Sequence, residues 1–366
     1  MTEALYDVVV AGGGPAGAMA ALSLARAGRR VLLLDESSDT LFKIGEALPP
    51  AARQLLQEVG LWDGFVAQGH LPCYGNLSAW GSSELHATDF IFDPNGVGWH
   101  LNRLRFDRLL QQAAAEAGVE VRTGAKLNPK ACEFSGDTWS IPVNGSELRS
   151  RWLIDATGRR SAVARAQGVS RCADDGLIAL FAVFRSSQST DEDSRTLIES
   201  DPDGWWYTAL LPSQQRVVAY LTDADLAPHD LRSQQGFLAQ LSRTVHVSAC
   251  LRAYDDAFED VKTVQANSAR LESFVGEGWI AVGDAAVSFD PLSSQGILTA
   301  LFTGLKAAEA LNEKSSFTDY SQRLTTIYNA YLSNRSAFYA QEQRWPTHPF
   351  WRRRHGLESE RQRRDI

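Results

Sequence analysis

The feature that most constrains this chain is a glycine-rich turn that joins a buried strand to a helix close to the N-terminus. Residues 5–11 are a valine-rich apolar run, which is typical of a strand buried on both faces of a parallel sheet. Residues 12–17 read G-G-G-P-A-G and match G-x-G-x-x-G, and an alanine-rich stretch over 16–27 predicts a helix. Small glycines let the backbone approach a pyrophosphate, and the helix N-terminus offers it free N–H groups.

A second buried strand is predicted over 31–34, and Asp35 closes it. Asp35 lies 23 positions after Gly12, near the spacing at which a carboxylate accepts hydrogen bonds from the ribose of a bound dinucleotide. A glycine-rich turn without a ligand is the alternative, but the strand, helix, strand and acid together favour a dinucleotide site. Another predicted strand ends at Asp155, before a turn at Gly158.

A third segment, late in the chain, has the same succession of strand, turn and helix. A strand is predicted over 279–282, followed by a Gly-Asp pair at 283–284 and a D-P-L-S-S-Q-G loop at 290–296. A long amphipathic helix follows, and we expect Ser293 or Ser294 to cap it. The N-terminus of such a helix can stabilise the negative charge of a reduced isoalloxazine ring.

These three segments resemble the motifs of the superfamily of single-component flavoprotein monooxygenases, flavin halogenases and geranylgeranyl reductases. The resemblance covers nearly the whole chain. It implies an α/β FAD-binding domain, Rossmann-like and of the glutathione reductase type, with an antiparallel β-sheet substrate domain and a C-terminal helical tail. The implied FAD contacts are Gly12, Gly14, Pro15, Ala16, Gly17, Asp35, Glu46, Arg53, Arg103, Asp155, Gly158, Gly283, Asp284, Gln295, Gly296 and Ile297.

For some of these residues a plainer role is the alternative. For Glu46 and Arg53 the alternative is an ordinary helix-start pair on a solvated face. Asp284 has the position of a strand-end carboxylate that caps the next turn.

The same resemblance sets the expected domain boundaries. They are 1–75, 99–165 and 270–314 for the FAD-binding domain, 76–98 and 166–269 for the substrate domain, and 315–366 for a C-terminal helical segment with a basic aromatic tail. Short apolar runs predict the antiparallel strands of the substrate domain, among them 179–184, 205–211 and 216–221. The runs 77–80 and 89–92 are expected to pair onto the same sheet.

The catalytic residues cannot be assigned from the sequence, but some side chains are candidates for the pocket wall. They are Trp206, Tyr207, Pro291, Ser294 and His100. Adjacent residues of a strand point to opposite faces, so of Trp205, Trp206 and Tyr207 at least one must face the cavity and one the far side. Trp206 is a candidate for the cavity face, and packing in the core is its alternative. A structural histidine is the favoured interpretation of His100.

Three stretches resemble a narrower group, the flavoprotein maturases of cysteine tryptophylquinone (lysine and glycine) oxidases. They are F-K-I-G-E-A-L-P-P-A-A-R-Q-L-L at 42–56, D-P-L-S-S-Q-G-I at 290–297, and R-W-P-x-x-P-F-W-R-R-R at 344–354. The resemblance implies a monooxygenase that hydroxylates a tryptophan of a precursor oxidase protein. A small-molecule aromatic hydroxylase is the main alternative, and a flavin-dependent reductase is a less favoured one. NAD(P)H or another donor would visit transiently, because only one G-x-G-x-x-G is present.

Halogenation is disfavoured by two departures from the halogenase pattern. The stretch 204–212 lacks the second tryptophan of W-x-W-x-I-P, and no lysine lies between Lys43 and Lys126, where a relay lysine is expected.

The net charge and the cysteine content exclude further classes of function and partner. The net charge of −8 disfavours a nucleic-acid partner, and four dispersed cysteines indicate neither a disulfide framework nor a metal site. We expect a cytoplasmic protein without a membrane segment or targeting signal. Residues 341–366 carry seven arginines and four acids, so this tail either binds a partner or folds back on the acidic body.

Overall fold

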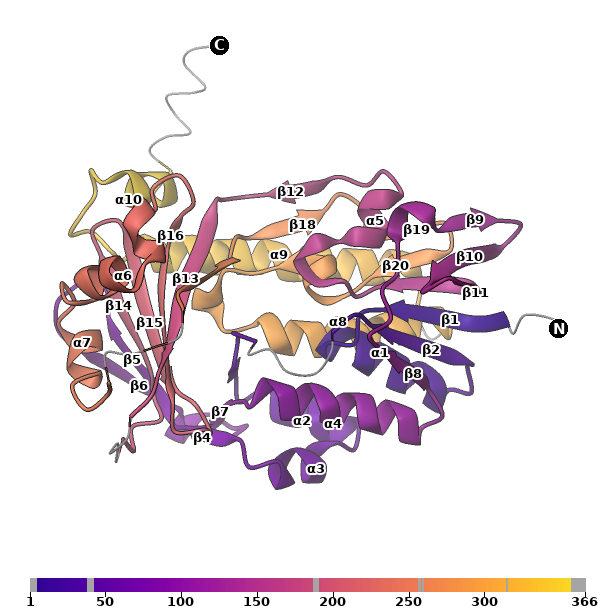
Figure 1. Cartoon of the computed structure of the whole chain (residues 1–366), viewed down its shortest axis with the longest axis horizontal. Coiled ribbons are helices and arrows are strands. Elements are labelled where there is room, and N and C mark those ends of the chain that lie inside the picture. The colour runs from indigo at the N-terminus through magenta and orange to yellow at the C-terminus, as the bar shows by residue number, and fades with distance from the viewer. Residues whose placement is uncertain are drawn as a thin grey trace, which may run out of the picture.

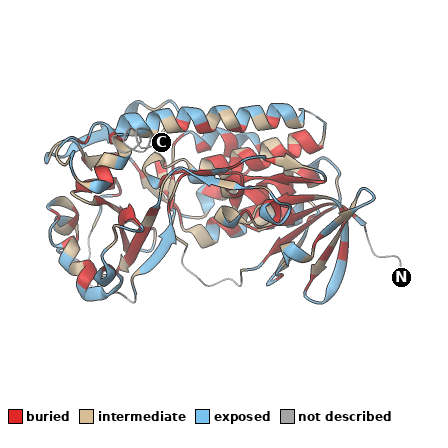
Figure 2. Ribbon diagram, turned by 90° about the horizontal axis from the view of Figure 1, so that it is seen from above, coloured by how far each residue is buried: buried red, intermediate tan, exposed pale blue. Residues whose placement is uncertain are grey.

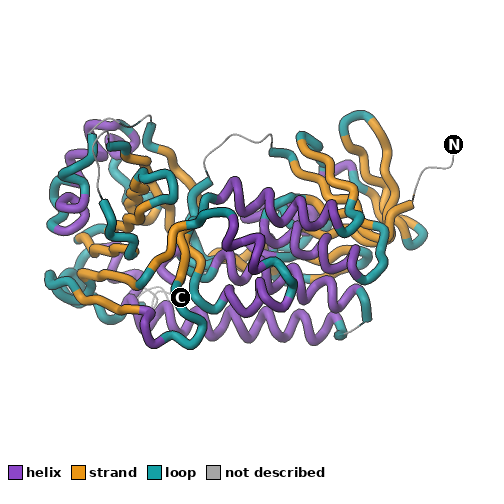
Figure 3. The backbone as a smooth tube through the Cα atoms, turned by 90° about the horizontal axis from the view of Figure 1, so that it is seen from below, coloured by secondary structure: helices purple, strands orange, loops and turns teal. Residues whose placement is uncertain are grey.

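The computed structural model describes residues 5–37, 43–186, 191–255, 258, 260–313 and 315–356. Residue 42 of the 42–56 stretch and the tail beyond residue 356 lie outside this part of the chain. Two sheets stand at opposite ends of an elongated molecule (Figure 1). Figure 3 shows most of the helices side by side between the two groups of strands.

The first sheet is built on parallel strands that carry the glycine-rich turn. Its main order is β19 (Val275–Gly276), β20 (Trp279–Ala281), β11 (Ser146–Asp155), β1 (Leu5–Ala11), β2 (Val31–Asp35) and β8 (Glu120–Thr123). Off this path, β10 (Thr138–Val143) pairs with β11, and β9 (Glu133–Ser135) pairs with β10. The strands β20, β11, β1, β2 and β8 pair in parallel, as the continuous apolar runs predict. Their carboxyl ends therefore meet at one edge, where ligands bind in open α/β sheets.

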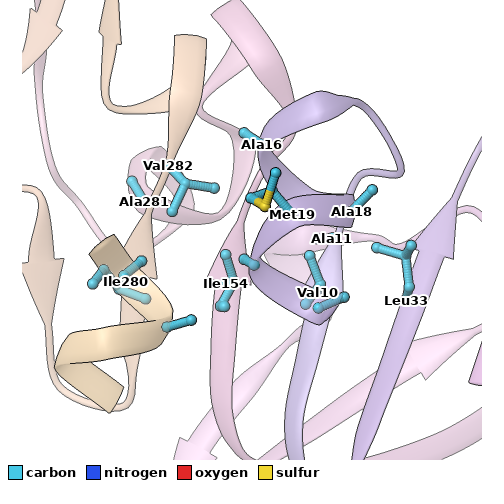
Figure 4. Close-up of a cluster of buried hydrophobic side chains, with 14 of the residues drawn as sticks. Val10, Ala11, Ala16, Ala18, Met19, Leu33, Ile154, Ile280, Ala281 and Val282 are labelled. Carbon is cyan, nitrogen blue, oxygen red and sulfur yellow. The ribbon is translucent and has the colours of Figure 1, made fainter. Parts of the chain in front are cut away.

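Helices cover this sheet closely. The main ones are α1 (Pro15–Arg26), α4 (Arg103–Glu116), α8 (Gly296–Leu311) and α9 (Phe317–Tyr339). Figure 4 shows Val10, Leu33, Ile154 and Ile280, from four neighbouring strands, packed beneath Met19 of α1. Burial of each such side chain stabilises the fold by about 1.5–3 kcal/mol. The central strands of both sheets are largely buried, whereas the edge strands and the outer side of α9 are exposed (Figure 2).

The second sheet forms the other end of the molecule. Its order is β17 (Lys262–Gln265), β13 (Leu177–Phe184), β16 (Arg216–Asp223), β15 (Gly204–Leu210), β14 (Thr196–Asp201), β5 (Gly75–Ala79) and β6 (His86–Asp89). All neighbours pair antiparallel except β14 and β5, which are parallel. The expected pairing of the first-half run at 77–80 onto this sheet is confirmed. The prediction of a strand over 89–92 is wrong, because β6 ends at Asp89 and Phe90–Phe92 is a 3-10 turn.

Small elements complete the two ends and the region between them. They are β3 (Ala47–Leu48), α2 (Ala52–Glu58), α3 (Trp62–Ala67), β4 (Leu71–Cys73), β7 (Gly98–His100), α5 (Ala162–Ala166), β12 (Arg171–Ala173), α6 (Gln234–Leu241), α7 (His246–Cys250), β18 (Ala269–Leu271) and β21 (Val287–Ser288). Helices α6 and α7 cover the far face of the second sheet, through Phe237 and Val247. Within the described ranges, no helix has the length and apolar character needed to cross a bilayer.

The described part of the tail folds back on the body. In α10 (Pro349–Arg354), the buried guanidinium of Arg354 donates to the Asp223 carboxylate at 2.8 Å, and both side chains are nearly inaccessible. The indole N–H of Trp351 donates to the carbonyl of Asp201 at 3.0 Å. The sequence left open whether the tail binds a partner or folds back on the body. These contacts show that its described part folds back.

Candidate functional site

A cavity of about 350 Å³ lies where the first sheet meets the inner face of the second. Segments that are far apart in the sequence converge on it. Its wall contains Gly14, Pro15, Ala16, Ile44, Gly45, Glu46, Arg103, Ala156, Gly158, Arg159, Ala179, Tyr207, Ala219, Leu221, Val264, Asp284, Asp290, Pro291, Ser294, Gln295, Gly296 and Ile297, among others. All three segments of the sequence pattern, at 12–17, 155–158 and 283–297, therefore reach one site.

The glycine-rich turn forms an open cradle at one end of this cavity. A Cβ added to Gly17 would lie 2.0 Å from the carbonyl oxygen of Gly12, so α1 can approach β1 only without a side chain there. A Cβ added to Gly14 would meet no atom within 4 Å. Gly14 thus faces open space at the start of α1, where backbone N–H groups and the helix dipole favour a diphosphate.

Asp35 lies directly behind this turn. Its Oδ1 accepts from the backbone N–H and the hydroxyl of Ser37, at 3.0 and 2.8 Å, and its Oδ2 accepts from the amide of Gln111 at 2.9 Å. The same Gln111 amide donates to the carbonyl of Gly13 at 2.7 Å. Nothing in the sequence around Gln111 indicates that α4 brings this side chain to the turn.

The 44–46 segment and α4 form the next part of the wall. The guanidinium of Arg103 donates to the carbonyl of Gly45 at 2.8 Å. Glu46 is only 1% exposed; its Oε2 accepts from the N–H of Gly45 at 3.0 Å and its Oε1 accepts from the Tyr207 hydroxyl. Arg53, however, is exposed on α2 outside this wall and stacks over the Trp62 ring at 5.1 Å. It does not pair with Glu46, so the surface-pair interpretation of these two residues is wrong.

Asp155 turns away from the cavity. Its buried carboxylate accepts from the backbone and hydroxyl of Thr157 and from the N–H groups of Val163 and Ala164. These bonds satisfy the start of α5, and Asp155 is absent from the cavity wall. These contacts give Asp155 a structural role, and its expected contact with the cofactor stays a prediction. Gly158 does line the cavity.

Asp284 reaches the cavity as predicted. Beside it lies Arg159, which the sequence did not indicate. The Oδ2 atom of Asp284 lies 3.4 Å from the Nε atom of Arg159, which also lines the wall. Gly283 is buried against α1, where an added Cβ would lie 2.7 Å from that of Ala16. The alternative of a carboxylate that only caps the following turn is not what the structure shows, because Asp284 is partly open to the cavity.

The loop at 290–296 carries the start of α8 to the cavity. Ser294 adopts a left-handed conformation with φ of 51°, and Gln295 precedes the helix without any side-chain cap. The expected capping of α8 by serine is wrong, because neither serine accepts a hydrogen bond from an N–H group inside the helix. Ser293 Oγ accepts from the N–H of Gln295, the residue before the helix, at 3.3 Å, and donates to the carbonyl of Asp290 at 2.9 Å. The first N–H groups of α8 are thus left for an anionic or polar group in the cavity.

The two candidates on β15 point to opposite faces. Tyr207 lines the cavity, whereas Trp206 packs on the far face against Tyr220 and Phe237, with ring centroids 4.8 and 5.3 Å away. The expectation that Trp206 lines the pocket is therefore wrong. Burial raises the pKa of Tyr207 well above its ordinary value, and the neighbouring Glu46 carboxylate adds to the rise.

His100 is fully buried and has two partners. Its Nδ1 lies 2.9 Å from the carbonyl oxygen of Leu210, and its Nε2 lies 3.0 Å from the hydroxyl of Thr196. Burial lowers the pKa of His100 to about 4, so the ring is neutral near pH 7. These contacts support the structural interpretation of His100.

A second cavity, of about 680 Å³, lies across a shared wall formed by Ala47, Phe289, Asp290, Ser294 and Gln295. Its other walls include Phe90, Trp99, His100, Thr196, Tyr331 and Phe338. The sequence did not indicate this cavity, because its lining comes from six stretches of the chain that are far apart, within 47–51, 73–76, 90–100, 289–299 and 327–338 and at 196.

The residues around the first cavity fit FAD. An open cradle at Gly14 suits the diphosphate, and the free start of α8 suits the polar edge of an isoalloxazine. Tyr207, Ala219 and Leu221 provide the wall opposite.

Comparison with known proteins agrees with this geometry. Residues 5–340 match the model of the family described as "FAD binding domain". LodB of Marinomonas mediterranea, assigned as an FAD-dependent oxidoreductase, is 34% identical over 96% of this chain and 97% of its own.

Two solved structures are similar over nearly the whole chain. The myxobacterial chondrochloren halogenase CndH superposes with a TM-score of 0.84 at 25% identity, covering 99% of this chain and 88% of its own. QhpG, a peptidyl tryptophan dihydroxylase essential for tryptophylquinone cofactor biogenesis, superposes with a TM-score of 0.80 at 26% identity, covering 96% and 79%. The α/β fold with a sheet-based second part, expected from the sequence, is thus that of FAD-dependent halogenases and monooxygenases. The chain belongs to the FAD-binding domain family and is an FAD-dependent oxidoreductase.

Proposed function

We propose that this enzyme is a monooxygenase that hydroxylates the tryptophan side chain of a partner polypeptide during tryptophylquinone biogenesis. The observation that carries the proposal is the second cavity, which adjoins the flavin cavity across the wall at 289–295 and is lined by aromatic rings. An indole ring packs well against such a surface. The similarity to QhpG, a peptidyl tryptophan dihydroxylase, supports the same assignment.

Bound FAD supplies activated oxygen once it is reduced and meets dioxygen. The task of the protein is to hold an electron-rich ring near the flavin and to exclude water. The apolar side chains of the second sheet and the loop at 290–296 close the flavin cavity for this purpose. We expect NAD(P)H or another donor to deliver electrons during a brief visit.

The shape of the second cavity favours a polypeptide over a small molecule. A small-molecule hydroxylase is expected to enclose its substrate and anchor it with polar groups. Here Phe338 lines the cavity yet is 54% exposed, and Ile91 and Phe92, next to the lining residue Phe90, are 79% and 92% exposed. An apolar rim of this kind suits a partner protein surface.

Halogenation is the second candidate, because CndH is similar over the whole chain. Two observations count against it. The stretch 204–212 lacks the second tryptophan of the halogenase motif, and no lysine is present among the described residues that line either cavity. A halogenase that relays halogen through a lysine needs such a residue between its two sites.

The direct test is to incubate the FAD-loaded protein with a tryptophan-bearing oxidase precursor, a reductant and dioxygen. We expect the intact mass of the precursor to rise by whole oxygen atoms. A precursor with the target tryptophan replaced by phenylalanine is the matched control and should stay unchanged. If the precursor remains unmodified while a free indole or phenol is oxygenated, the small-molecule alternative holds instead.

A further inference from the structure

Thr299, in the first turn of α8, carries a hydroxyl that has no hydrogen-bond partner among the described residues. The residue is only 9% exposed, and it lines the second cavity. Thr303, Thr325 and Thr326 of α8 and α9, by contrast, each donate to the carbonyl four residues earlier, at 2.8–2.9 Å. Thr299 makes no such bond to Gln295, so its hydroxyl is left for a molecule in the cavity.

The other polar side chains of the second cavity are either paired or more exposed. Those with partners within the protein are His100, Thr196, Asp93, Asp290, Ser293, Tyr331 and Arg335. Some hydroxyl and amide side chains share with Thr299 the lack of a partner in the described part of the chain. They are Asn76, Ser294, Gln295 and Asn334, all of them less buried. Because a buried polar group gains most from a partner, Thr299 is the group that a ring inside this cavity would use.

The place of Thr299 on α8 relates the second cavity to the flavin. Ile297 and Ala300 of the same helical turn line the flavin cavity, whereas Thr299 lines the second cavity. An α-helix has about 3.6 residues per turn, so neighbouring positions of one turn face different sides. Thr299 is not among the described residues that line the flavin cavity, and its hydroxyl is therefore assigned to the substrate and not to FAD. A ring held by Thr299 lies directly beside the flavin.

The surroundings of Thr299 fit an indole. Aromatic rings line the same cavity, from Phe90, Trp99, Phe289, Tyr331 and Phe338. An indole packs against such rings through its faces, and its single polar group is an N–H that donates and cannot accept. A threonine hydroxyl has lone pairs that accept such a bond. The one polar group of an indole thus meets one buried, unpaired acceptor among aromatic walls.

We propose, on the basis of the tryptophan-hydroxylating function proposed above, that Thr299 accepts a hydrogen bond from the indole N–H of the target tryptophan. This bond sets the rotation of the ring within the second cavity. With its N–H held at Thr299 and its faces held by the aromatic walls, the indole has one orientation toward the flavin. The same ring carbons then meet the activated oxygen at every turnover.

The test compares two forms of the oxidase precursor. The target position carries either tryptophan or benzothienylalanine, whose ring has nearly the same shape but a sulfur atom in place of the N–H group. Titration calorimetry measures the binding of each form to the oxidised, FAD-loaded enzyme, so no turnover is needed. We expect Thr299→Val to weaken binding of the tryptophan form by roughly threefold to tenfold. The same variant should bind the benzothienylalanine form as tightly as the wild type does.

Two control variants accompany this comparison. Thr299→Ser keeps the hydroxyl and should retain the wild-type preference for the tryptophan form. Thr326→Val, at an exposed threonine of α9, should match the wild type with both forms. Flavin titration of each variant shows that the FAD site is intact, and Thr299→Ala replaces Thr299→Val if the valine variant does not fold.

Equal weakening of both precursor forms by Thr299→Val, or no change with either, would overturn the inference. If the wild type still hydroxylates the tryptophan form in that case, the proposed function stands without a role for Thr299. A wild type that binds neither form would contradict the proposed function itself, and the role of Thr299 would fall with it.

Discussion

Gly14 and Gly17 meet different physical needs although they belong to one motif. At Gly17 the helix crosses the strand so closely that a methyl group would overlap the carbonyl oxygen of Gly12. At Gly14 the backbone has an ordinary extended conformation, with φ of −73°, and no protein atom occupies the space in front of it. Gly17 is therefore required by the fold, and Gly14 by the ligand.

The matched pair Gly14→Ala and Gly17→Ala tests this distinction. Gly17→Ala should lower the free energy of unfolding by about 3 kcal/mol through overpacking. Gly14→Ala should change it by less than about 1 kcal/mol, yet weaken FAD binding by roughly tenfold or more, or about 1.4 kcal/mol. Urea unfolding of the FAD-free proteins and flavin titration measure the two quantities. Equal loss of stability in both variants would contradict the account.

Sequence reasoning succeeded for residues whose role is local and failed where a distant surface decides. The turn at 12–17 is set by its own neighbours, and it was predictable. Which of Trp206 and Tyr207 faces the cavity depends on where the rest of the core lies against β15, and a strand pattern alone leaves that open. The position of Asp155 at the end of a strand favours a contact with the ligand. A carboxylate at such a position can equally well accept hydrogen bonds from the helix that follows, and the sequence alone does not distinguish the two roles.

At the scale of elements, α9 links the two ends of the molecule. It begins beside β11, where the Phe317 and Trp152 rings lie 5.0 Å apart, and ends against β15, where Trp205 donates to the Tyr339 hydroxyl at 3.1 Å. The same Tyr339 hydroxyl donates at 2.7 Å to the Asp290 carboxylate, which starts the loop at the flavin cavity. Helix α9 therefore fixes that loop.

Tyr339→Phe should lower the free energy of unfolding by about 1–3 kcal/mol, because it deprives the buried Asp290 carboxylate of a donor. The displaced loop should also weaken FAD binding. Tyr74→Phe, at an exposed tyrosine, is the control and should leave both quantities unchanged. Chemical denaturation and flavin titration measure the effects. An unaltered Tyr339→Phe protein would show that α9 does not hold the loop.

Elements were predicted best where a run of residues decides them. The parallel strands and α1 follow from apolar runs and the glycine turn. The turn at Phe90–Phe92 was taken for a strand because its composition is apolar and aromatic, yet it lies on the exposed rim of the second cavity. Helix α8 begins without a cap, so the serines before it gave a misleading signal.

At the scale of the whole molecule, buried neutral histidine makes stability depend on pH. Burial lowers the pKa of His100 from 6.5 to about 4, so between these values the unfolded chain binds a proton that the folded chain does not. Stability from this group is therefore complete above pH 6.5 and is lost as the pH falls toward 4. His70, whose pKa burial also lowers to about 4, acts in the same direction.

We expect the free energy of unfolding to fall between pH 7 and pH 5, with His100 contributing about 2 kcal/mol of the loss. His100→Gln keeps polar groups at this position and removes the titration, so its stability should depend less on pH in this window. Urea unfolding at several pH values gives the slope. A wild type and His100→Gln with the same slope would show that His100 is not neutral when folded.

The central claim is that this enzyme places oxygen from dioxygen on a tryptophan of a partner polypeptide. Its most direct test is a reaction of the FAD-loaded protein with the oxidase precursor under isotopically labelled dioxygen, followed by peptide mapping in a tandem mass spectrometer. The account predicts labelled oxygen on the indole of the target tryptophan. Oxygen derived from water, a halogen in place of oxygen, or an unmodified tryptophan would contradict it.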